Sequence, residues 1–139
     1  MYECNNHPIF GDHGNQPLII NIEYNAKFNP YFRTALWTGN NLQITLMSIP
    51  AGGDIGVEMH NDVDQIIRIE SGCALVSIGK CQNSLTRQRK VDSNYLIVIP
   101  AGTWHNITNV GSCPLKLSSI YSPPNHPFGT NQKSSEHDE

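Results

Sequence analysis

The sequence predicts a single all-β domain of the sandwich or barrel type, on three observations. The chain has 139 residues, a length that fits one domain able to bury about 68% of its unfolded surface. Its apolar residues are mostly β-branched: 15 Ile and 6 Val stand against 9 Leu and only 5 Ala, a choice that suits a pleated sheet better than a helix. Turn formers are frequent, with 11 Gly, 9 Pro and 15 Asn. Many short strands joined by tight turns are therefore expected.

The chain is expected to begin with an irregular arm over residues 1–17, which is rich in Asn, His and Gly. The barrel would span residues 18–124, followed by a polar, partly disordered tail over residues 125–139. Within the barrel, β-branched and aromatic runs bounded by turn signals predict short strands, and no amphipathic helix of useful length is visible. The predicted strands are 18–24, 31–38, 42–49, 57–59, 63–70, 73–79, 87–91, 95–99, 105–109 and 115–121.

One predicted strand carries a polar residue on its apolar face. In the segment 63–70, Gln65 is in phase with Val63, Ile67 and Ile69, while charged residues occupy the other phase. Because the apolar phase should face the core, the amide of Gln65 is expected to point inward. A buried amide needs partners.

Two blocks of sequence carry the other candidate site residues. In the first, Glu58 and His60 are two residues apart, so on a strand both side chains leave the same face. In the second, His105 follows a Pro-x-Gly turn, where a strand re-enters the sheet. Two imidazoles, one carboxylate and the Gln65 amide could converge from adjacent strands. Such a mixed nitrogen and oxygen set suits Zn, Mn, Fe, Ni or Co and leaves positions for water or substrate.

These blocks resemble the two motifs of the cupin superfamily. The first motif aligns with Gly53 to Gly72, and the second, G-x5-P-x-G-x2-H-x3-N, aligns with Asn94 to Asn109. The second motif is matched at every spacing by Pro100, Gly102, His105 and Asn109. Asn94 replaces its Gly, a mild change because Asn tolerates left-handed backbone.

The resemblance implies a cupin-type double-stranded β-helix, or jelly-roll barrel, with a divalent transition metal inside. Carried over by position, Glu58 replaces the first histidine ligand, His60 is the second, Gln65 replaces the glutamate and His105 is the last ligand. The metal would be Zn, Mn, Fe or Ni. The alternative is a metal-free barrel whose polar interior is satisfied by waters.

The resemblance leaves three kinds of function open. Small cupins similar to this chain are described as mannose-6-phosphate isomerase-like, which implies an enzyme using the metal as a Lewis acid on a small sugar-like or keto-acid substrate. Isomerase, epimerase or lyase chemistry also needs a base. Glu58 could be that base if it is not a permanent ligand, and His126 in the Pro-rich segment could act as acid or base. The alternatives are a non-haem metal dioxygenase and a non-catalytic small-molecule-binding cupin.

Composition and charge exclude several partners. With 12 acidic and 9 basic residues the formal charge is −3, and no basic cluster exceeds residues 87–90, so no nucleic-acid partner is expected. No apolar run approaches the ~18–20 residues of a membrane span, and the N-terminal residues lack the pattern of a secretory signal. A cytoplasmic protein without a membrane partner is expected. Its four cysteines show no C-x-x-C spacing and are expected to be free, partly buried thiols.

A homodimer is expected from the first predicted strand. The apolar set of residues 18–24 is more than a small barrel would cover. Exchange of this strand between two copies would hide an edge that is otherwise open to aggregation.

Overall fold

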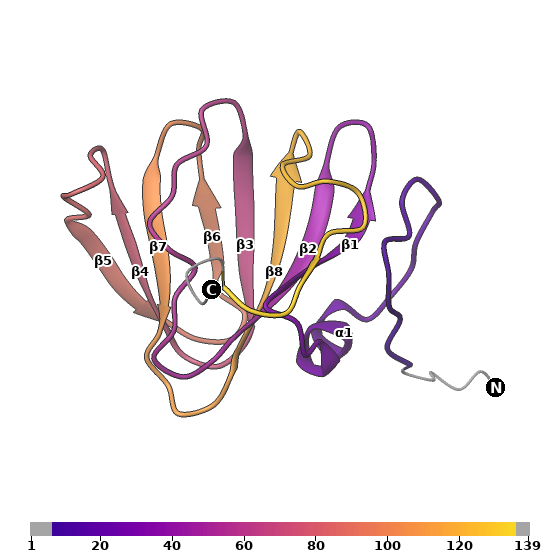
Figure 1. The fold of residues 1–139 in the computed structure, drawn as a ribbon. Coiled ribbons are helices and arrows are strands. Elements are labelled where there is room, and N and C mark those ends of the chain that lie inside the picture. The colour runs from indigo at the N-terminus through magenta and orange to yellow at the C-terminus, as the bar shows by residue number, and fades with distance from the viewer. Residues whose placement is uncertain (1–6, 136–139) are drawn as a thin grey trace.

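The structure is a computed structural model that describes residues 7–135, and nearly all of its regular elements are strands (Figure 1). This confirms the all-β prediction. Eight predicted strands coincide with β1 to β8, with ends displaced by no more than two residues. The strands are β1 (Arg33–Thr38), β2 (Gln43–Ile49), β3 (Asp64–Ser71), β4 (Ala74–Gly79), β5 (Arg87–Val91), β6 (Leu96–Ile99), β7 (Trp104–Asn109), β8 (Leu115–Ser122) and β9 (Asn131–Gln132).

The strands form two antiparallel sheets. The larger has the order β6-β3-β8-β2-β1-β9 and the smaller the order β5-β4-β7. Buried side chains from both sheets make one core, which includes Met47 and Ile67 of the larger sheet and Val76 and Ile107 of the smaller. Because neighbouring strands lie far apart in the sequence, most of the chain's contacts are long-range.

The predicted strand 57–59 is reduced to a single bridge. Glu58 pairs with His105 of β7, and Asp54 pairs with Thr108 further along the same strand. The amide of Ile55 also donates to the carbonyl of Ile107, at 3.1 Å. This irregular segment therefore covers the free edge of β7 and extends the smaller sheet without being a regular strand.

The prediction of a strand over residues 18–24 is wrong. Residues 18–21 have no regular structure, and a helix, α1 (Ile22–Phe28), begins immediately after them. Its N-cap is Asn21, whose side chain accepts from the amide of Tyr24, and Lys27 pairs with Glu23 one turn earlier at 2.7 Å. These local helix signals outweigh the β-branched run. The strand that was expected to be exchanged in a homodimer is therefore absent.

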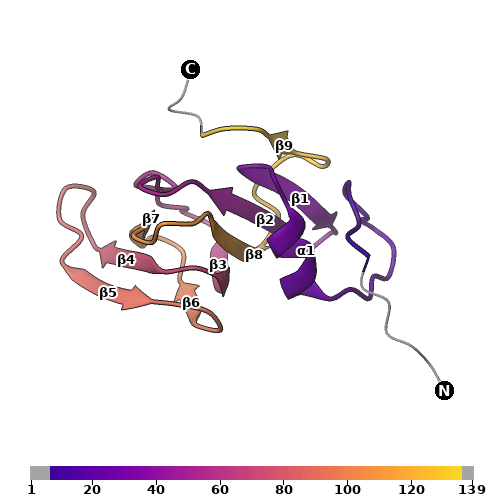
Figure 2. The same ribbon diagram turned by 90° about the horizontal axis from the view of Figure 1, so that it is seen from below.

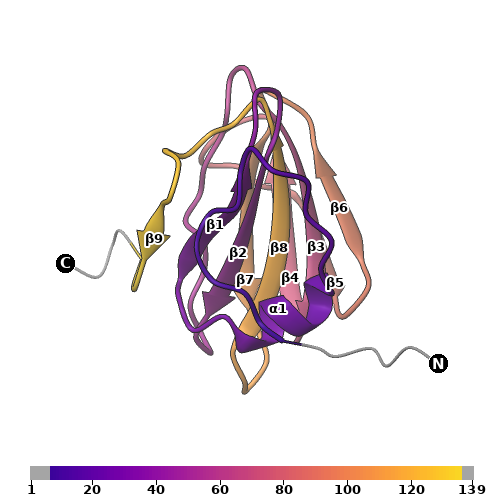
Figure 3. The same ribbon diagram turned by 90° about the vertical axis from the view of Figure 1, so that its right-hand side faces the viewer.

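Helix α1 covers part of the outer face of the larger sheet. Figure 3 shows it at one end of the sheet, in front of β2, β8 and β3. Ala26 of the helix packs with Leu36 of β1 and Leu46 of β2 in a second, smaller apolar cluster. This cluster explains how Leu46 is buried although it points away from the barrel interior.

The two ends of the described chain pack against the same edge of the larger sheet. Residues 7–17 contain no strand or helix. The expected tail contains β9, which pairs with Arg33 and Thr34 of β1 (Figure 2). Residues 1–6 of the arm and 136–139 of the tail lie outside the described residues.

The described cysteines differ from expectation in one respect. Cys73, Cys81 and Cys113 are free, but they are exposed rather than partly buried. In the described part of the chain, no helix has the length and apolarity needed to cross a membrane.

Candidate metal centre

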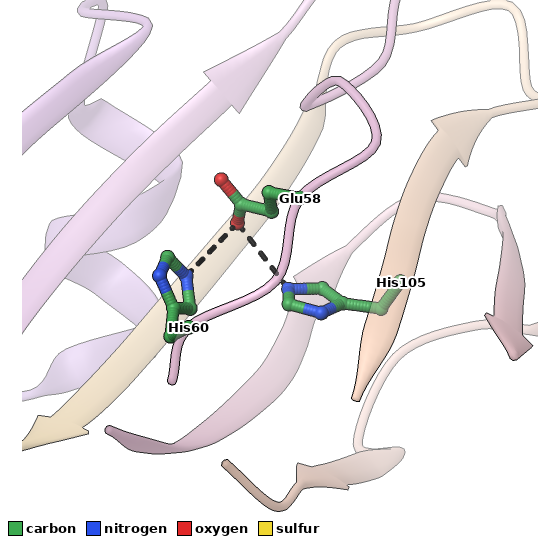
Figure 4. A group of neighbouring side chains, drawn as sticks. All are labelled: Glu58, His60 and His105. Carbon is green, nitrogen blue, oxygen red and sulfur yellow. Dashed lines mark ion pairs between the residues drawn. The ribbon is translucent and has the colours of Figure 1, made fainter. Parts of the chain in front are cut away.

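Three of the four predicted ligands converge in the structure (Figure 4). One carboxylate oxygen of Glu58, Oε1, lies 3.5 Å from Nε2 of His60 and 3.3 Å from Nε2 of His105. The potential ligand atoms of the three residues all lie within 4.8 Å of one another. Glu58 and His60 are partly exposed, at 25% and 16% of their side chains, whereas His105 is completely buried. The group is therefore open to solvent on one side.

Backbone pairing brings Glu58 and His105 together. The amide of Glu58 donates to the carbonyl of His105 at 3.0 Å, and the amide of His105 donates to the carbonyl of Glu58 at 2.9 Å. Residues that exchange both bonds in an antiparallel pair project their side chains to the same face. His60 follows two residues later, and its carbonyl accepts from the amide of Gly102 at 2.7 Å. Gly102 has φ +83°, a conformation that favours glycine.

The donor atoms fit a cation better than they fit one another. Nδ1 of His105 lies 3.0 Å from the carbonyl oxygen of Thr103, which only accepts, so Nδ1 carries the proton and Nε2 presents a lone pair. That lone pair faces the carboxylate of Glu58, another acceptor. Nε2 of His60 and Nε2 of His105 are both buried without a hydrogen-bond partner. A buried acceptor that faces another acceptor without a proton between them, as Nε2 of His105 faces Glu58, is an arrangement that a metal ion resolves.

Glu58 is an ionised carboxylate in this setting. Burial alone would raise its pKa, but the imidazoles of His105 and His60 that face the carboxylate lower the pKa of Glu58 to about 2. Such a group is a good metal ligand and a poor base near neutral pH.

Gln65 points inward, as predicted. It is 2% exposed, it lies on β3 opposite Tyr121 of β8, and its Oε1 has no hydrogen-bond partner. The amide oxygen is therefore buried and available on the inner face. Its role as a fourth ligand stays a prediction.

His126 lies near this group through an intermediate ring. Its imidazole packs edge-on against Tyr121, with ring centroids 5.2 Å apart. Tyr121 in turn packs edge-on against His60, with centroids 6.0 Å apart. The buried amide of Gln43 accepts from the His126 amide at 2.9 Å and donates to the His126 carbonyl at 2.8 Å. The segment after β8 is thus held in place beside the candidate centre.

The sequence did not point to Gln43 as part of this region. Gln43 and Thr45 form the polar phase of β2, which an ordinary amphipathic strand would turn to solvent. Both are completely buried, while Ile44 in the opposite phase faces outward and is only partly buried. Alternation alone carries no signal for this inversion.

No family model matches the chain. It is 56% identical over 119 residues to YrkC of Bacillus subtilis (strain 168), which covers 86% of this chain and 64% of YrkC. It is 41% identical over 116 residues to L612 of Acanthamoeba polyphaga mimivirus, which covers 83% of this chain and 71% of L612. Both relatives are described as uncharacterized proteins. The chain spans just under two thirds of the length of YrkC.

Solved structures agree with these relationships. The crystal structure of BH2720 from Bacillus halodurans matches with a TM-score of 0.88 and 53% identity, over 89% of this chain and 94% of that chain. An RmlC-like cupin from Shewanella frigidimarina matches with a TM-score of 0.58 and 15% identity, over 68% and 77% of the two chains. KdgF from Halomonas sp. matches with a TM-score of 0.60 and 17% identity, over 67% and 78%. The chain belongs to the family of L612 and BH2720, and its fold is the double-stranded β-helix of the cupins.

Proposed function

We propose that this cupin binds a divalent transition metal through Glu58, His60 and His105, with the amide oxygen of Gln65 as a fourth ligand. The observation that carries the proposal is the convergence of two buried imidazole nitrogens, neither with a hydrogen-bond partner, on the Glu58 carboxylate. Two imidazoles, one carboxylate and one amide suit Zn, Mn, Fe or Ni. The three ligands other than Gln65 carry one negative charge in total, that of Glu58. A bound divalent ion would therefore give the centre a net positive charge.

We further propose that the protein is an enzyme acting on a small sugar-like or keto-acid substrate, by isomerase, epimerase or lyase chemistry. When bound, the metal supplies Lewis-acid polarisation of a carbonyl or hydroxyl oxygen. Glu58 serves as a ligand rather than as the base, because its lowered pKa makes it a weak proton acceptor. The partly exposed side of the centre, at Glu58 and His60, is the side from which a substrate would approach.

His126 is our candidate for proton transfer. Its ring lies against Tyr121, which also contacts His60, and imidazole is the side chain whose ordinary pKa lies nearest neutrality. Gln43 holds the His126 backbone through both its amide and its carbonyl. The side chain would therefore act from a fixed position beside the centre.

Two other functions use the same centre. A non-haem metal dioxygenase also needs open metal positions, and a non-catalytic cupin could hold a ligand without turnover. Oxygen consumption separates the first from the proposed chemistry. Ligand binding without product formation in a metabolite panel would favour the second.

The test of the proposal is metal content. Purified wild-type protein, reconstituted with Zn, Mn, Fe or Ni and dialysed, should hold about one ion per chain by plasma mass spectrometry. His60→Ala and His105→Ala should lose it, whereas His7→Ala, which changes an exposed histidine of the arm, should retain it. A wild type that carries no stoichiometric metal and gains none would refute the metal-binding proposal.

A homodimer also remains our proposal, now through a different surface. The outer face of the larger sheet carries exposed aliphatic side chains, and Ile19, which is 99% exposed, projects beside the groove that they line. Of the side chains on the sheet itself that line the groove, Leu96 is 60% exposed, Ile120 37% and Ile66 36%. Continuous apolar patches of this kind mark interaction surfaces. A second copy fits because each chain offers both a protruding Ile19 and an apolar groove.

A further inference from the structure

Arg33 is a buried cation without an acidic partner. The residue lies on β1 and is 4% exposed. Its Nη1 donates to Oε1 of Gln132 at 2.8 Å, and its Nη2 approaches the sulfur of Met47 at 4.0 Å. Its Nε has no hydrogen-bond partner, and none of the ion pairs within residues 7–135 includes it. A buried guanidinium is costly unless an anion compensates it.

The strand register places Arg33 on the inner face of the larger sheet. Arg33 is paired with Met47 of β2, which belongs to the main core. Arg33 also lies near Tyr121, because burial raises the pKa of Tyr121 and the charge of Arg33 opposes this rise. The ring of Tyr121 contacts His60 of the candidate metal centre. Arg33 and the centre therefore lie in the same barrel interior, separated by one side chain.

A second unpartnered donor lies on the same face. Ser119 of β8 is 2% exposed, and its hydroxyl has no hydrogen-bond partner. It is paired with Thr45 of β2, whose side chain is a neighbour of the Tyr121 hydroxyl. The inner wall thus offers a guanidinium N–H and a hydroxyl donor, both buried. Such a pair matches an acceptor-only group, of which a carboxylate is the smallest common example.

The net charge inside the barrel also favours an anionic ligand. A bound divalent metal and Arg33 would together bring three positive charges, and Glu58 offsets only one of them. A neutral polyol would leave this excess unchanged, whereas an anionic ligand would reduce it. This step rests on the proposed metal centre, whereas the lack of an acidic partner for Arg33 is independent of it.

We propose that the barrel takes a small carboxylate, such as a keto or hydroxy acid, with its carboxylate held by the guanidinium of Arg33 and its other end directed to the metal centre. Arg33 is then the residue that selects an acid over a neutral sugar. In the structure, Oε1 of Gln132, on the two-residue strand β9, accepts a hydrogen bond from Arg33. A ligand's carboxylate oxygen would accept from the guanidinium in the same way. A planar guanidinium fork suits this recognition better than a lysine does.

Calorimetry and thermal unfolding with defined probes test this assignment. Malonate, pyruvate, inorganic phosphate and the neutral polyol erythritol are titrated into metal-loaded and EDTA-treated wild type, Arg33→Met, Arg33→Lys and Arg68→Met. Arg68→Met is the matched control, because Arg68 is partly exposed and already paired with Glu70 at 3.0 Å. Malonate or pyruvate should bind the wild type and raise its unfolding temperature, and erythritol should not. Arg33→Met should weaken that binding about 10–100-fold, with metal content unchanged, while Arg68→Met should match the wild type.

Each other outcome has a definite meaning. Equal binding of carboxylates to Arg33→Met and wild type, equal binding of erythritol, or no binding of either carboxylate overturns the assignment. Tighter binding of phosphate than of malonate, lost in Arg33→Met, overturns the carboxylate and leaves a phosphate site. If Arg33→Met does not fold, Arg33→Lys decides: it should prefer malonate to erythritol but bind it more weakly than wild type. Absence of metal uptake refutes the proposed function alone, and the EDTA-treated protein then still tests Arg33.

Discussion

Oε1 of Glu58 lies 3.3 Å from Nε2 of His105, across a pair of backbone hydrogen bonds that join the two residues directly. The pairing fixes the separation of the two backbones and directs both side chains to the same face. Tight backbone support of this kind is what a preorganised metal centre requires.

Replacing Glu58 by Gln should remove the charge of the centre while keeping its shape. We expect metal affinity to fall by at least about 10–100-fold, the cost of losing even an outer-shell partner of a metal ligand. Competition with a chromogenic chelator measures the change. Glu23→Gln, which alters an exposed carboxylate of α1 paired with Lys27, should leave affinity unchanged. Equal affinities for Glu58→Gln and wild type would remove Glu58 from the ligand set.

Asn109 should matter for stability rather than for metal binding. Its buried amide donates to the carbonyls of Ile49 and Cys113, at 2.9 and 2.8 Å, and its Oδ1 accepts from the amide of Gly111 at 2.9 Å. Asn109→Ala leaves these groups unpaired and should cost about 2–3 kcal/mol in urea unfolding. Asn83→Ala, at an exposed position, should cost less than about 0.5 kcal/mol. A change in metal content without a change in stability would contradict this assignment.

Gln43 should keep the segment after β8 in place. Gln43→Ala removes its bonds to the backbone of Asn125 and His126, and buried groups left unpaired cost about 1–3 kcal/mol each. We expect faster hydrogen exchange at the amides of residues 125 and 126, together with lower stability. Gln88→Ala, at an exposed position on β5, is the control. Unchanged exchange at these two amides would show that the segment is held by other contacts.

Stability should depend on pH through Asp12. Partial burial would raise its pKa, but hydrogen bonds from the Thr38 hydroxyl and from the amides of Gly129 and Gly14 lower the pKa of Asp12 below 3.8. Because the folded-state pKa is lowered, the stabilisation is present above the unfolded-state value and is lost as pH falls through the folded-state value. Asp12→Asn should therefore be less stable than wild type by about 1 kcal/mol at pH 7. Urea unfolding at a series of pH values should show the difference shrinking below pH 3.8, and a difference that grows there would contradict it.

Dimerisation through the outer face of the larger sheet should be visible in solution. Size-exclusion chromatography with light scattering should give about twice the 15.5 kDa of one chain. Leu96→Asp, which changes an exposed side chain that lines the groove, should yield the monomer because burying an unpaired carboxylate is costly. Val110→Asp, at an exposed apolar residue outside the groove, should leave the dimer intact. A wild-type mass of 15.5 kDa would exclude the dimer.

The sequence by itself determined the fold class and the strand positions, because alternation of side chains and turn residues are local properties. Residues 87–91 were predicted as a strand and form β5 with the same bounds. The motif spacing also singled out Glu58, His60 and His105, which the fold brings together. The wrong prediction of a strand over residues 18–24 also has a local cause, because the capping residue Asn21 starts a helix within an otherwise β-like run.

Only the tertiary structure decided which face of each strand is inside. Period-two alternation defines two faces but does not say which one meets the core, so the burial of Gln43 and Thr45 and the inward position of Arg33 followed from sheet pairing alone. The contact between Glu58 and His105 likewise depends on a register between segments distant in sequence. These long-range pairings, which no local pattern encodes, assemble the candidate centre and place a cation beside it.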